Sequence, residues 1–446
     1  MRDGPGLPER TASGAEDDRS HRPAWLRFTP FLQRPPPLTR RQWSVLGLVS
    51  VVSLFETYDV YLFTLNLAQI QRELGIEESQ LGLLGSLVRA GALGAILVTL
   101  AADRLGRRRM LLVTVLAYTL LTGATALAPN AFWFVGFQMA ARVFATAEGL
   151  LAVVVIAEEF DPEHRGWGIG ALGAISACGG GLAALLFGFV NVLPFGWRAL
   201  YAVGLVPLLA LAWWRRSMPE TERFLALEHE RGAGLRATPA LAPFAALLRG
   251  YPRRLAALAG AALLISLVTS PAIFFAPKYL QDVHGWSPGW VAALTFVGGG
   301  FAIVANPIAG RLSDRRGRRP VTAFFLLAAA LLAVAFYTGP ALVLAPLWAL
   351  MMFGNFGGDV TLAAYGAELF PTSYRSTASG ARSFVTTLGT VGGLAGVSVL
   401  FTLVGSNWNA IALLGALALL APVLVWLAFP ETSGRSLEEI APEPPA

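Results

Sequence analysis

Long runs of apolar side chains, separated by short basic segments, dominate this chain of 446 residues. A helix needs roughly 20 apolar residues to cross the hydrocarbon core of a bilayer. Twelve runs of about this length can be read, at residues 43–69, 80–101, 110–127, 132–156, 168–190, 199–214, 255–277, 291–308, 321–337, 342–365, 378–401 and 411–429. The sequence therefore predicts an all-α membrane protein with twelve transmembrane helices.

Composition agrees with a membrane protein and argues against other classes. Hydrophobic residues make up 55% of the chain and charged residues 14%, against roughly 25% charged in a typical soluble protein. The pI near 9.8 does not indicate nucleic acid, because the basic residues lie in clusters between apolar runs and not on one face. The expected surroundings are the lipid bilayer of the cell (inner) membrane.

Motifs for enzymatic or metal chemistry are missing from the sequence. The single cysteine, Cys178, lies in an apolar run, so no disulfide framework is expected. The four histidines fall in predicted loops or tails, and no HExxH, CxxC or CxxCH occurs. We therefore expect no catalytic residues, no metal and no cofactor, and predict that the protein is not an enzyme.

Arginine placement predicts the orientation of the chain. Four arginines lie in the loop between predicted helices 2 and 3, five between helices 8 and 9, and eight between helices 6 and 7. Only Arg72, Arg198 and Lys278 lie in the alternate loops, so the arginine-rich loops and both termini are predicted to be cytoplasmic. The expected regions are a disordered tail (1–41), a six-helix bundle (42–215), a cytoplasmic linker (216–253), a second six-helix bundle (254–430) and a tail (431–446).

Three short motifs recur at one spacing, which indicates two similar halves. The offset is 211 residues (314 − 103) for the first motif, 210 for the second (367 − 157) and 211 for the third (430 − 219). The motifs are D-R-L-G-R-R at 103–108 and D-R-R-G-R-R at 314–319, A-E-E-F at 157–160 and A-E-L-F at 367–370, and P-E-T at 219–221 and 430–432.

These motifs resemble those of the major facilitator superfamily across nearly the whole chain. The two D-R-x-G-R-R loops resemble that family's cytoplasmic gate motif, and the segments that begin at residues 219 and 430 resemble the signatures of sugar porters and metabolite–proton symporters. The resemblance implies two pseudo-symmetric six-helix bundles, alternation between inward- and outward-facing states, and a monomer. It departs from the family at Thr99, where the gate motif has a glycine; Gly310 fits in the second copy.

The gate motifs have a physical interpretation. Gly106 and Gly317 permit a tight turn between two helices, and the acids can pair with arginines or lie at a helix N-terminus across the interface between halves. The alternative is that these residues only set topology as solvated charges, each worth about 0–1 kcal/mol. The predicted gating residues are Asp103, Arg107, Arg108, Asp314, Arg318, Arg319, Glu158, Arg165, Glu368 and Arg375.

Two acids in the first predicted helix are the main candidates for proton coupling. Glu56 and Asp59 are three residues apart and therefore share a helix face. Two neighbouring carboxylates in a low dielectric cannot both ionise at low cost, so one is expected to carry a proton near neutral pH. The segment 55–59 also resembles helix 1 of proton-coupled organic-acid transporters. The alternative is that both acids pair with Arg89 and Arg142 only to hold the bundle together.

Ionisable groups inside a bilayer are costly and tend to be functional. Besides Glu56 and Asp59, the predicted coupling residues are Arg142, Glu148 and Asp359. Glu148 and Asp359 lie 211 residues apart (359 − 148), at equivalent positions of the repeat. Four acids against two arginines leave two acids over, which favours proton coupling. The predicted substrate-binding residues are Tyr58, Arg89, Gln138, Asn355 and Trp348.

The predicted function is secondary active transport of a small polar metabolite by proton symport. Residues 168–190 and 255–277 lack the glutamines that sugar porters carry there, which favours an organic acid, whose carboxylate suits an arginine. Proton-driven efflux by antiport and uniport remain as alternatives, although helix 5 lacks the Gly-Pro pair of drug antiporters. Pro271 and Pro277 are expected to break helix 7.

Overall fold

The computed structural model describes residues 35–105, 107–214, 242–435 and 437–441, together with residues 23, 25, 26, 29 and 32. The first half contains α2 (Arg40–Leu65), α3 (Leu67–Leu74), η3 (Glu78–Gln80), α4 (Leu81–Leu105), α5 (Arg107–Ala126), α6 (Ala131–Glu159), α7 (Arg165–Phe187) and α8 (Trp197–Trp214). The second half contains α10 (Ala242–Gly250), α11 (Pro252–Asp282), α12 (Pro288–Arg316), α13 (Arg318–Thr338), η5 (Ala341–Val343), α14 (Leu344–Glu368), η6 (Thr372–Tyr374), α15 (Arg375–Val404), α16 (Asn407–Ala418), α17 (Leu420–Ala428) and α18 (Leu437–Ile440).

The long helices match the predicted spans. Within the described residues, eleven helical segments are long and apolar enough to cross a membrane by length and composition, with α16 and α17 together forming the last. The remaining predicted span, 199–214, corresponds to α8, which packs against α5 but is not among the eleven. The all-helical membrane fold is therefore confirmed, with eleven candidate spans where the sequence predicted twelve.

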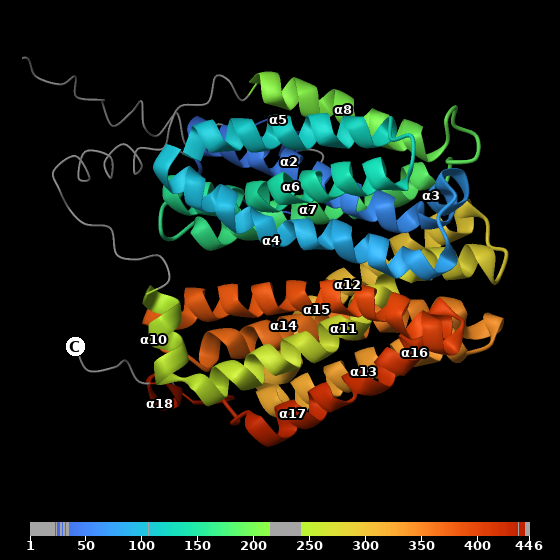
Figure 1. Ribbon diagram of the computed structural model, residues 1–446. Coiled ribbons are helices and arrows are strands. Elements are labelled where there is room, and N and C mark those ends of the chain that lie inside the picture. Colours follow the sequence, from blue (N-terminus) through green and yellow to red (C-terminus); the bar gives the residue numbers. More distant parts are fainter. Residues whose placement is uncertain are drawn as a thin grey trace, which may run out of the picture.

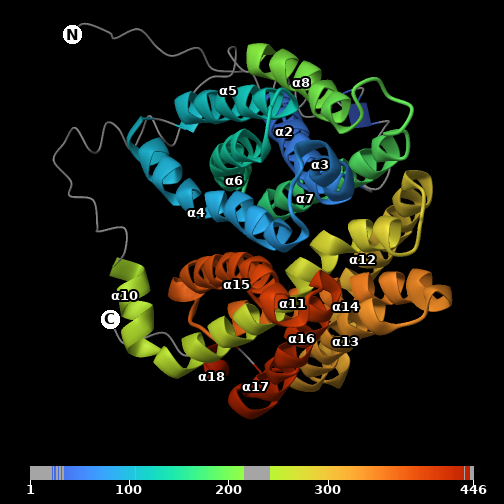
Figure 2. The same ribbon diagram turned by 45° about the vertical axis from the view of Figure 1, so that its right-hand side comes forward.

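The two halves have the same internal packing, as the sequence repeat predicted. In the first half the main helix pairs are α2 with α7, α4 with α6, α5 with α6 and α5 with α8. The equivalent pairs in the second half are α11 with α15, α12 with α14, α13 with α14 and α13 with α16. The halves meet through α4 against α15 and α12 against α7, again an equivalent pair, so the two bundles lie side by side (Figures 1 and 2).

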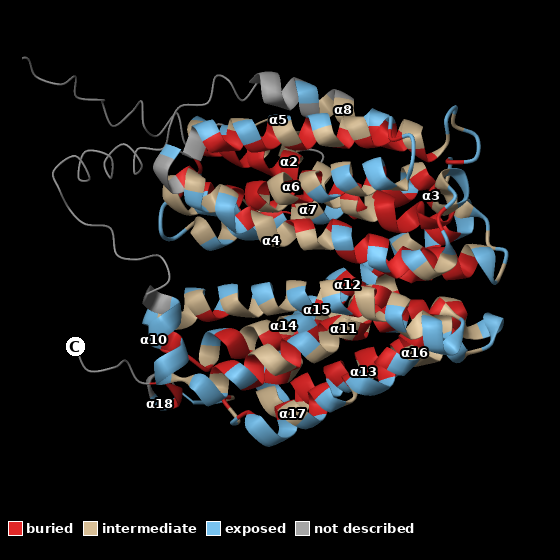
Figure 3. Ribbon diagram, in the orientation of Figure 1, coloured by how far each residue is buried: buried red, intermediate tan, exposed pale blue. Residues whose placement is uncertain are grey.

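The two bundles share two ends, the linker end and the opposite end. The linker end contains the start of α2, the whole of α10 and the end of α17, and the opposite end contains α3, η3 and the start of α16 (Figure 1). Buried residues concentrate where helices of one half face each other (Figure 3), while large apolar side chains such as Leu97, Phe296 and Leu427 are exposed. Exposed apolar side chains along long helices suit contact with lipid chains.

Local signals explain where several helices begin. A capping box of Thr39 and Gln42 starts α2, and a serine followed by proline, Ser287-Pro288, starts α12. Gly317 joins α12 to α13 with φ of +104°, a backbone conformation that favours glycine. The predicted tight turn of the second gate motif is therefore confirmed at this residue.

Two expectations need correction. Pro271 and Pro277 do not break helix 7, because α11 runs through both from Pro252 to Asp282. Part of the predicted disordered tail is packed: Trp25 makes an edge-to-face contact with Trp43, and Leu32 and Leu38 are buried in the same cluster. The apolar side chains at these positions pack against α2, although the overall composition of the tail is charged.

Candidate functional site

A cluster of buried polar side chains occupies the interior of the first half. Asp59 of α2 has 2% of its surface exposed, and its carboxylate lies 3.9 Å from the Arg142 guanidinium of α6 (Nη2–Oδ2). Gln138, one turn before Arg142, donates from Nε2 to Asp59 Oδ1 at 3.4 Å and to the Thr125 hydroxyl at 3.2 Å. The structure therefore brings three sequence-predicted site residues into one group.

Glu56 and Glu148 lie close to this group, towards the linker end. The Glu56 carboxylate fills the space that Gly149 leaves on α6, since a Cβ there would be 3.1 Å from Glu56 Oε2. Glu148 is fully buried, and the Thr114 hydroxyl of α5 contacts its Oε2 at 2.5 Å. Among the described side chains of the first half, three carboxyl groups thus lie in its interior, on two helices.

Two arginines of the first half have unsatisfied N–H groups. The Nε atoms of Arg89 on α4 and Arg142 on α6 are buried and have no hydrogen-bond partner among the described residues. Buried donors are nearly always hydrogen-bonded, to protein, water or ligand. These guanidinium groups are therefore places where water or a polar solute can bind.

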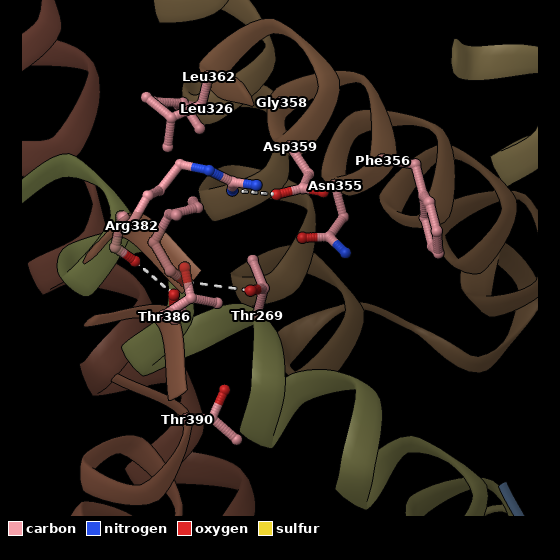
Figure 4. Close-up of a pocket in the computed structure, with 13 residues that line it drawn as sticks. Thr269, Leu326, Asn355, Phe356, Gly358, Asp359, Leu362, Arg382, Thr386 and Thr390 are labelled. Atoms are coloured by element: carbon pink, nitrogen blue, oxygen red, sulfur yellow. Dashed lines mark hydrogen bonds and ion pairs between the residues drawn. The ribbon is translucent and has the colours of Figure 1, made fainter. Parts of the chain in front are cut away.

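A cavity of about 280 Å³ lies in the second half, between α11, α13, α14 and α15. On its wall Arg382 of α15 pairs with Asp359 of α14 (Nη1–Oδ1, 2.8 Å), and Asn355 lies one turn before Asp359 (Figure 4). The other polar lining groups are hydroxyls, among them Thr386 and Thr390 (Figure 4). This combination of one ion pair, one amide and several hydroxyls is suited to a small polar solute.

The sequence interpretation missed Arg382. The residue lies within the predicted span 378–401 but was not counted among the ionisable groups of the membrane, although its position in an apolar run was a sufficient signal. With Arg382 included, the ionisable residues considered inside the predicted spans are four acids and three arginines. Since Asp359 pairs with Arg382, the predicted surplus of carboxylates is smaller than the sequence suggested.

Two predicted substrate-binding residues lie in packed surroundings in this conformation. Tyr58 is buried, and its hydroxyl donates to the Leu200 carbonyl at 2.8 Å. Trp348 is buried against Gly298, and its indole N–H has no partner in the described part of the chain. Of the five predicted substrate-binding residues, only Asn355 lines the cavity of the second half.

Arg318, the first residue of α13, is the centre of an ion-pair network at the linker end. Its guanidinium pairs with Asp314 (Nη1–Oδ1, 2.7 Å) and with Glu368 (Nη2–Oε1, 2.8 Å). The Thr432 hydroxyl donates to Glu368 at 2.6 Å. Asp314 therefore pairs with an arginine within its own half, and the network joins α12, α13, α14 and the segment after α17.

Glu431 caps the N-terminus of α13 with its carboxylate. It accepts backbone N–H groups from Arg318 at 2.7 Å, Arg319 at 3.2 Å, and Thr432 and Ser433 at 3.0 Å each. A carboxylate at this helix end also interacts favourably with the helix dipole. Burial raises the pKa of Glu431, but these four hydrogen bonds outweigh burial and hold that pKa below its usual value of 4.5.

We predict that Glu431→Gln lowers the melting temperature of the protein in detergent at neutral pH. A carboxyl group whose pKa is lowered on folding contributes stability above its unfolded-state pKa, and this contribution is lost as the pH falls through the folded-state pKa. The difference in melting temperature from the unchanged protein should therefore shrink as the pH falls through this lowered pKa, and it should vanish where Glu431 is protonated in the folded state as well. Glu77→Gln, at an exposed position, is the control, and a gap that is constant with pH would contradict the cap.

The remaining predicted gating residues are described in part. Arg165 donates from Nε to the Phe160 carbonyl at 3.0 Å, and its repeat equivalent Arg375 donates to the Phe370 carbonyl at 3.4 Å. Arg319 stacks on the Trp426 ring at 4.7 Å, and Glu158 lies at the linker end of α6 beside Glu159. The side chains of Asp103, Arg107 and Arg108 lie outside the described residues.

The two halves are joined at the opposite end. Hydrogen bonds and ion pairs found between described residues of the two halves all lie there. Gln69 donates to Gln281 at 2.7 Å, Lys278 pairs with Glu78 at 3.1 Å, and Asn407 donates to the Glu78 carboxylate at 2.9 Å. The seam between α4 and α15 is a second line of contacts between the halves. There the Ser86 hydroxyl donates to the Val391 carbonyl (2.9 Å), and the Ser398 hydroxyl accepts a hydrogen bond from the Leu83 N–H (2.9 Å).

Comparison with known proteins decides the family. The model of the Major Facilitator Superfamily matches residues 49–393 and 289–444. The chain belongs to this superfamily. It is therefore a membrane transporter, as predicted, and not an enzyme, and the predicted multi-pass location in the cell (inner) membrane is confirmed.

Individual superfamily members have similar length and shape. The chain is 25% identical to the niacin transporter of Acinetobacter baylyi, over 91% of this chain and 97% of the relative. It is 27% identical to the cis,cis-muconate transport protein of the same organism, over 78% and 85%. A bacterial homologue of the human lysosomal transporter Spinster, solved in an inward-facing and occupied conformation, superposes with a TM-score of 0.72 at 15% identity, over 88% of this chain and 97% of that one.

Proposed function

We propose that this transporter moves a small organic acid across the membrane together with a proton, by alternating access. The observation that carries the proposal is the buried Asp59, which has Arg142 at 3.9 Å and one amide hydrogen bond. A buried carboxylate with so few partners is costly to keep ionised, so it is suited to bind and release a proton. The relatives named for niacin and for muconate, both compounds with carboxyl groups, support an organic acid as the cargo.

The geometry suggests how proton and anion binding are linked. When Asp59 is ionised, it compensates the charge of Arg142 in the low-dielectric interior. A proton on Asp59 removes that compensation, and the negative charge of a solute in the transport pathway restores it by its electrostatic effect on the guanidinium groups of Arg142 and Arg89. Each event therefore favours the other, and linkage of this kind is reciprocal. Glu56 and Glu148 are proposed as further groups that bind the proton during transport.

The arrangement of the two halves supports alternating access. We infer the predicted orientation, with the linker end in the cytoplasm, so the present conformation is inward-facing. The halves then rock about their interface, the contacts at the opposite end break, and the gate residues at the linker end form new contacts between the halves. The protein is proposed to act as a monomer.

Uptake into proteoliposomes under an imposed pH gradient tests the proposal. The vesicles have an alkaline lumen, and labelled nicotinate, cis,cis-muconate, xylose and a cationic amine are added outside. Protein-dependent accumulation of an acid above its outside concentration is expected, with protein-free vesicles as the control for passive entry. Equilibration without accumulation would instead make the protein a uniporter. In a second set of vesicles, with an acidic lumen, uptake of the amine driven by the outward proton gradient would favour the antiport alternative.

A further inference from the structure

The ion pair in the cavity of the second half differs from the buried charges of the first half in its exposure. The Asp359 side chain has 63% of its surface exposed, while that of Arg382 has 16%. Both side chains line the cavity and point toward one another (Figure 4), and Asp359 is the more exposed partner of the pair. An exposed ion pair contributes only about 0–1 kcal/mol, so Asp359 is easily displaced from its partner.

The contact between the two side chains leaves most of the guanidinium unused. Asp359 accepts a single N–H, from Nη1 of Arg382, out of five that a guanidinium offers. No other hydrogen bond of Arg382 is found among the described residues. A carboxylate that approaches Arg382 in the guanidinium plane can accept two parallel N–H groups, which is a stronger arrangement than the present one.

The rest of the cavity suits one small acid. Its volume of about 280 Å³ is slightly below the range of about 300–1,000 Å³ that is typical of pockets for drug-sized ligands. Phe356 provides an apolar face, and Asn355, Thr386 and Thr390 provide polar groups. The carboxylate of a small acid can thus reach Arg382 while its remaining atoms stay in contact with the lining.

We propose that the Asp359 carboxylate takes the position on Arg382 that the carboxylate of the solute occupies when the solute is bound. It occupies Arg382 while the cavity is empty, and a carboxylate-bearing solute displaces it and binds Arg382. Displaced Asp359 remains in the open cavity, where water solvates its charge. A neutral solute of the same shape cannot compete with Asp359, so the pair selects carboxylates over their amides. This inference rests on the proposed function, because it names the group of the solute that is recognised.

The equivalent position of the first half does not offer such an exchange. Glu148, which corresponds to Asp359 in the repeat, is fully buried and is contacted by Thr114 at 2.5 Å. A solute cannot reach it in this conformation without opening of the helix packing. Recognition of the carboxylate by exchange is therefore assigned to the second half alone.

Binding to purified protein in detergent tests the exchange without any proton gradient. The probes are nicotinate and its neutral isostere nicotinamide, with cis,cis-muconate as a second acid, measured by calorimetry and by ligand-induced shifts in melting temperature. Asp359→Asn should bind at least one of the acids up to about fivefold more tightly, because its competitor is gone. Arg382→Gln should bind the acids at least about tenfold more weakly, and Arg382→Lys should be intermediate.

The control is Glu159→Gln. Glu159 forms an ion pair with Arg41 at the linker end (2.7 Å), so this variant removes a carboxylate from a different arginine and should leave the affinity for both acids unchanged. Melting temperatures without ligand show whether each variant folds. The proposal would be overturned if Asp359→Asn weakened acid binding as much as Arg382→Gln does. It would also be overturned if Asp359→Asn increased the affinity for nicotinamide as much as that for the acids, or if neither the unchanged protein nor any variant bound an acid. Absence of proton movement in vesicles, with the expected binding pattern, would remove the symport proposal and leave this one standing.

Discussion

Asp59→Asn is expected to convert an accumulating transporter into one that only equilibrates its solute. An asparagine keeps the size and one hydrogen-bond acceptor of Asp59 but cannot bind a proton, so the linkage between proton and anion is lost. With one proton carried per solute, the unchanged protein should concentrate an acid about tenfold for each pH unit across the vesicle. The variant should reach a ratio near one while it still exchanges labelled for unlabelled solute.

The exchange reaction is the internal control of this experiment, because it needs folding and alternating access but no proton gradient. Asp161→Asn, at an exposed position between α6 and α7, is the matched control and should accumulate solute like the unchanged protein. Undiminished accumulation by the Asp59 variant would remove Asp59 from the coupling mechanism. Loss of both accumulation and exchange would mean that Asp59 is needed for the fold or for solute binding.

Gly82→Val is expected to prevent closure of the opposite end. Gly82 of α4 lies against α15, where an added Cβ would be 2.4 Å from the Leu394 carbonyl oxygen and 2.9 Å from the Ser398 hydroxyl. Overpacking of this kind costs about 1–3 kcal/mol, which is about a 5- to 150-fold shift in the balance between conformations. Because only the conformation closed at that end has this contact, transport should fall by a similar factor.

Accessibility of a cysteine at Leu394 reports the shift directly. Leu394 is fully buried, so Leu394→Cys, in a Cys178→Ser background, should react slowly with a maleimide and faster once Gly82→Val is added. Gly136→Val is the matched control, because a Cβ at Gly136 meets no atom within 4 Å. Equal labelling rates and unimpaired transport in the Gly82 variant would show that the seam between α4 and α15 is not closed during transport.

The sequence was sufficient to predict the pseudo-symmetry and to select three polar residues that the structure brings together. The repeated motifs predicted equivalent halves because related sequences pack related helices in the same way. Asp59, Gln138 and Arg142 were recognised individually because polar groups are rare inside apolar runs. Their meeting followed from the packing of α2 and α6 in one bundle.

Contacts between distant loops and helices were beyond the sequence. Nothing in the chain indicated that Glu78, in a polar segment between two spans, would meet Lys278 and Asn407 from the other half. The pairing of Asp359 with Arg382 likewise depends on how α14 and α15 are rotated about their axes. The apolar pattern of such a helix does not define this rotation, because one side faces lipid and another faces a cavity. Asp314 pairs with Arg318 of its own half in this structure, and the sequence did not indicate which half it would contact.

Simultaneous recording of solute uptake and lumen pH in proteoliposomes tests the central claim most directly. The membrane potential is clamped, cis,cis-muconate or nicotinate is added, and proton and solute fluxes are compared with those in protein-free vesicles. The proposal predicts that acid entry through the protein acidifies the lumen in a fixed ratio to the solute, and that Asp59→Asn abolishes this proton flux. Entry of the acid through the unchanged protein with no accompanying proton would contradict the account.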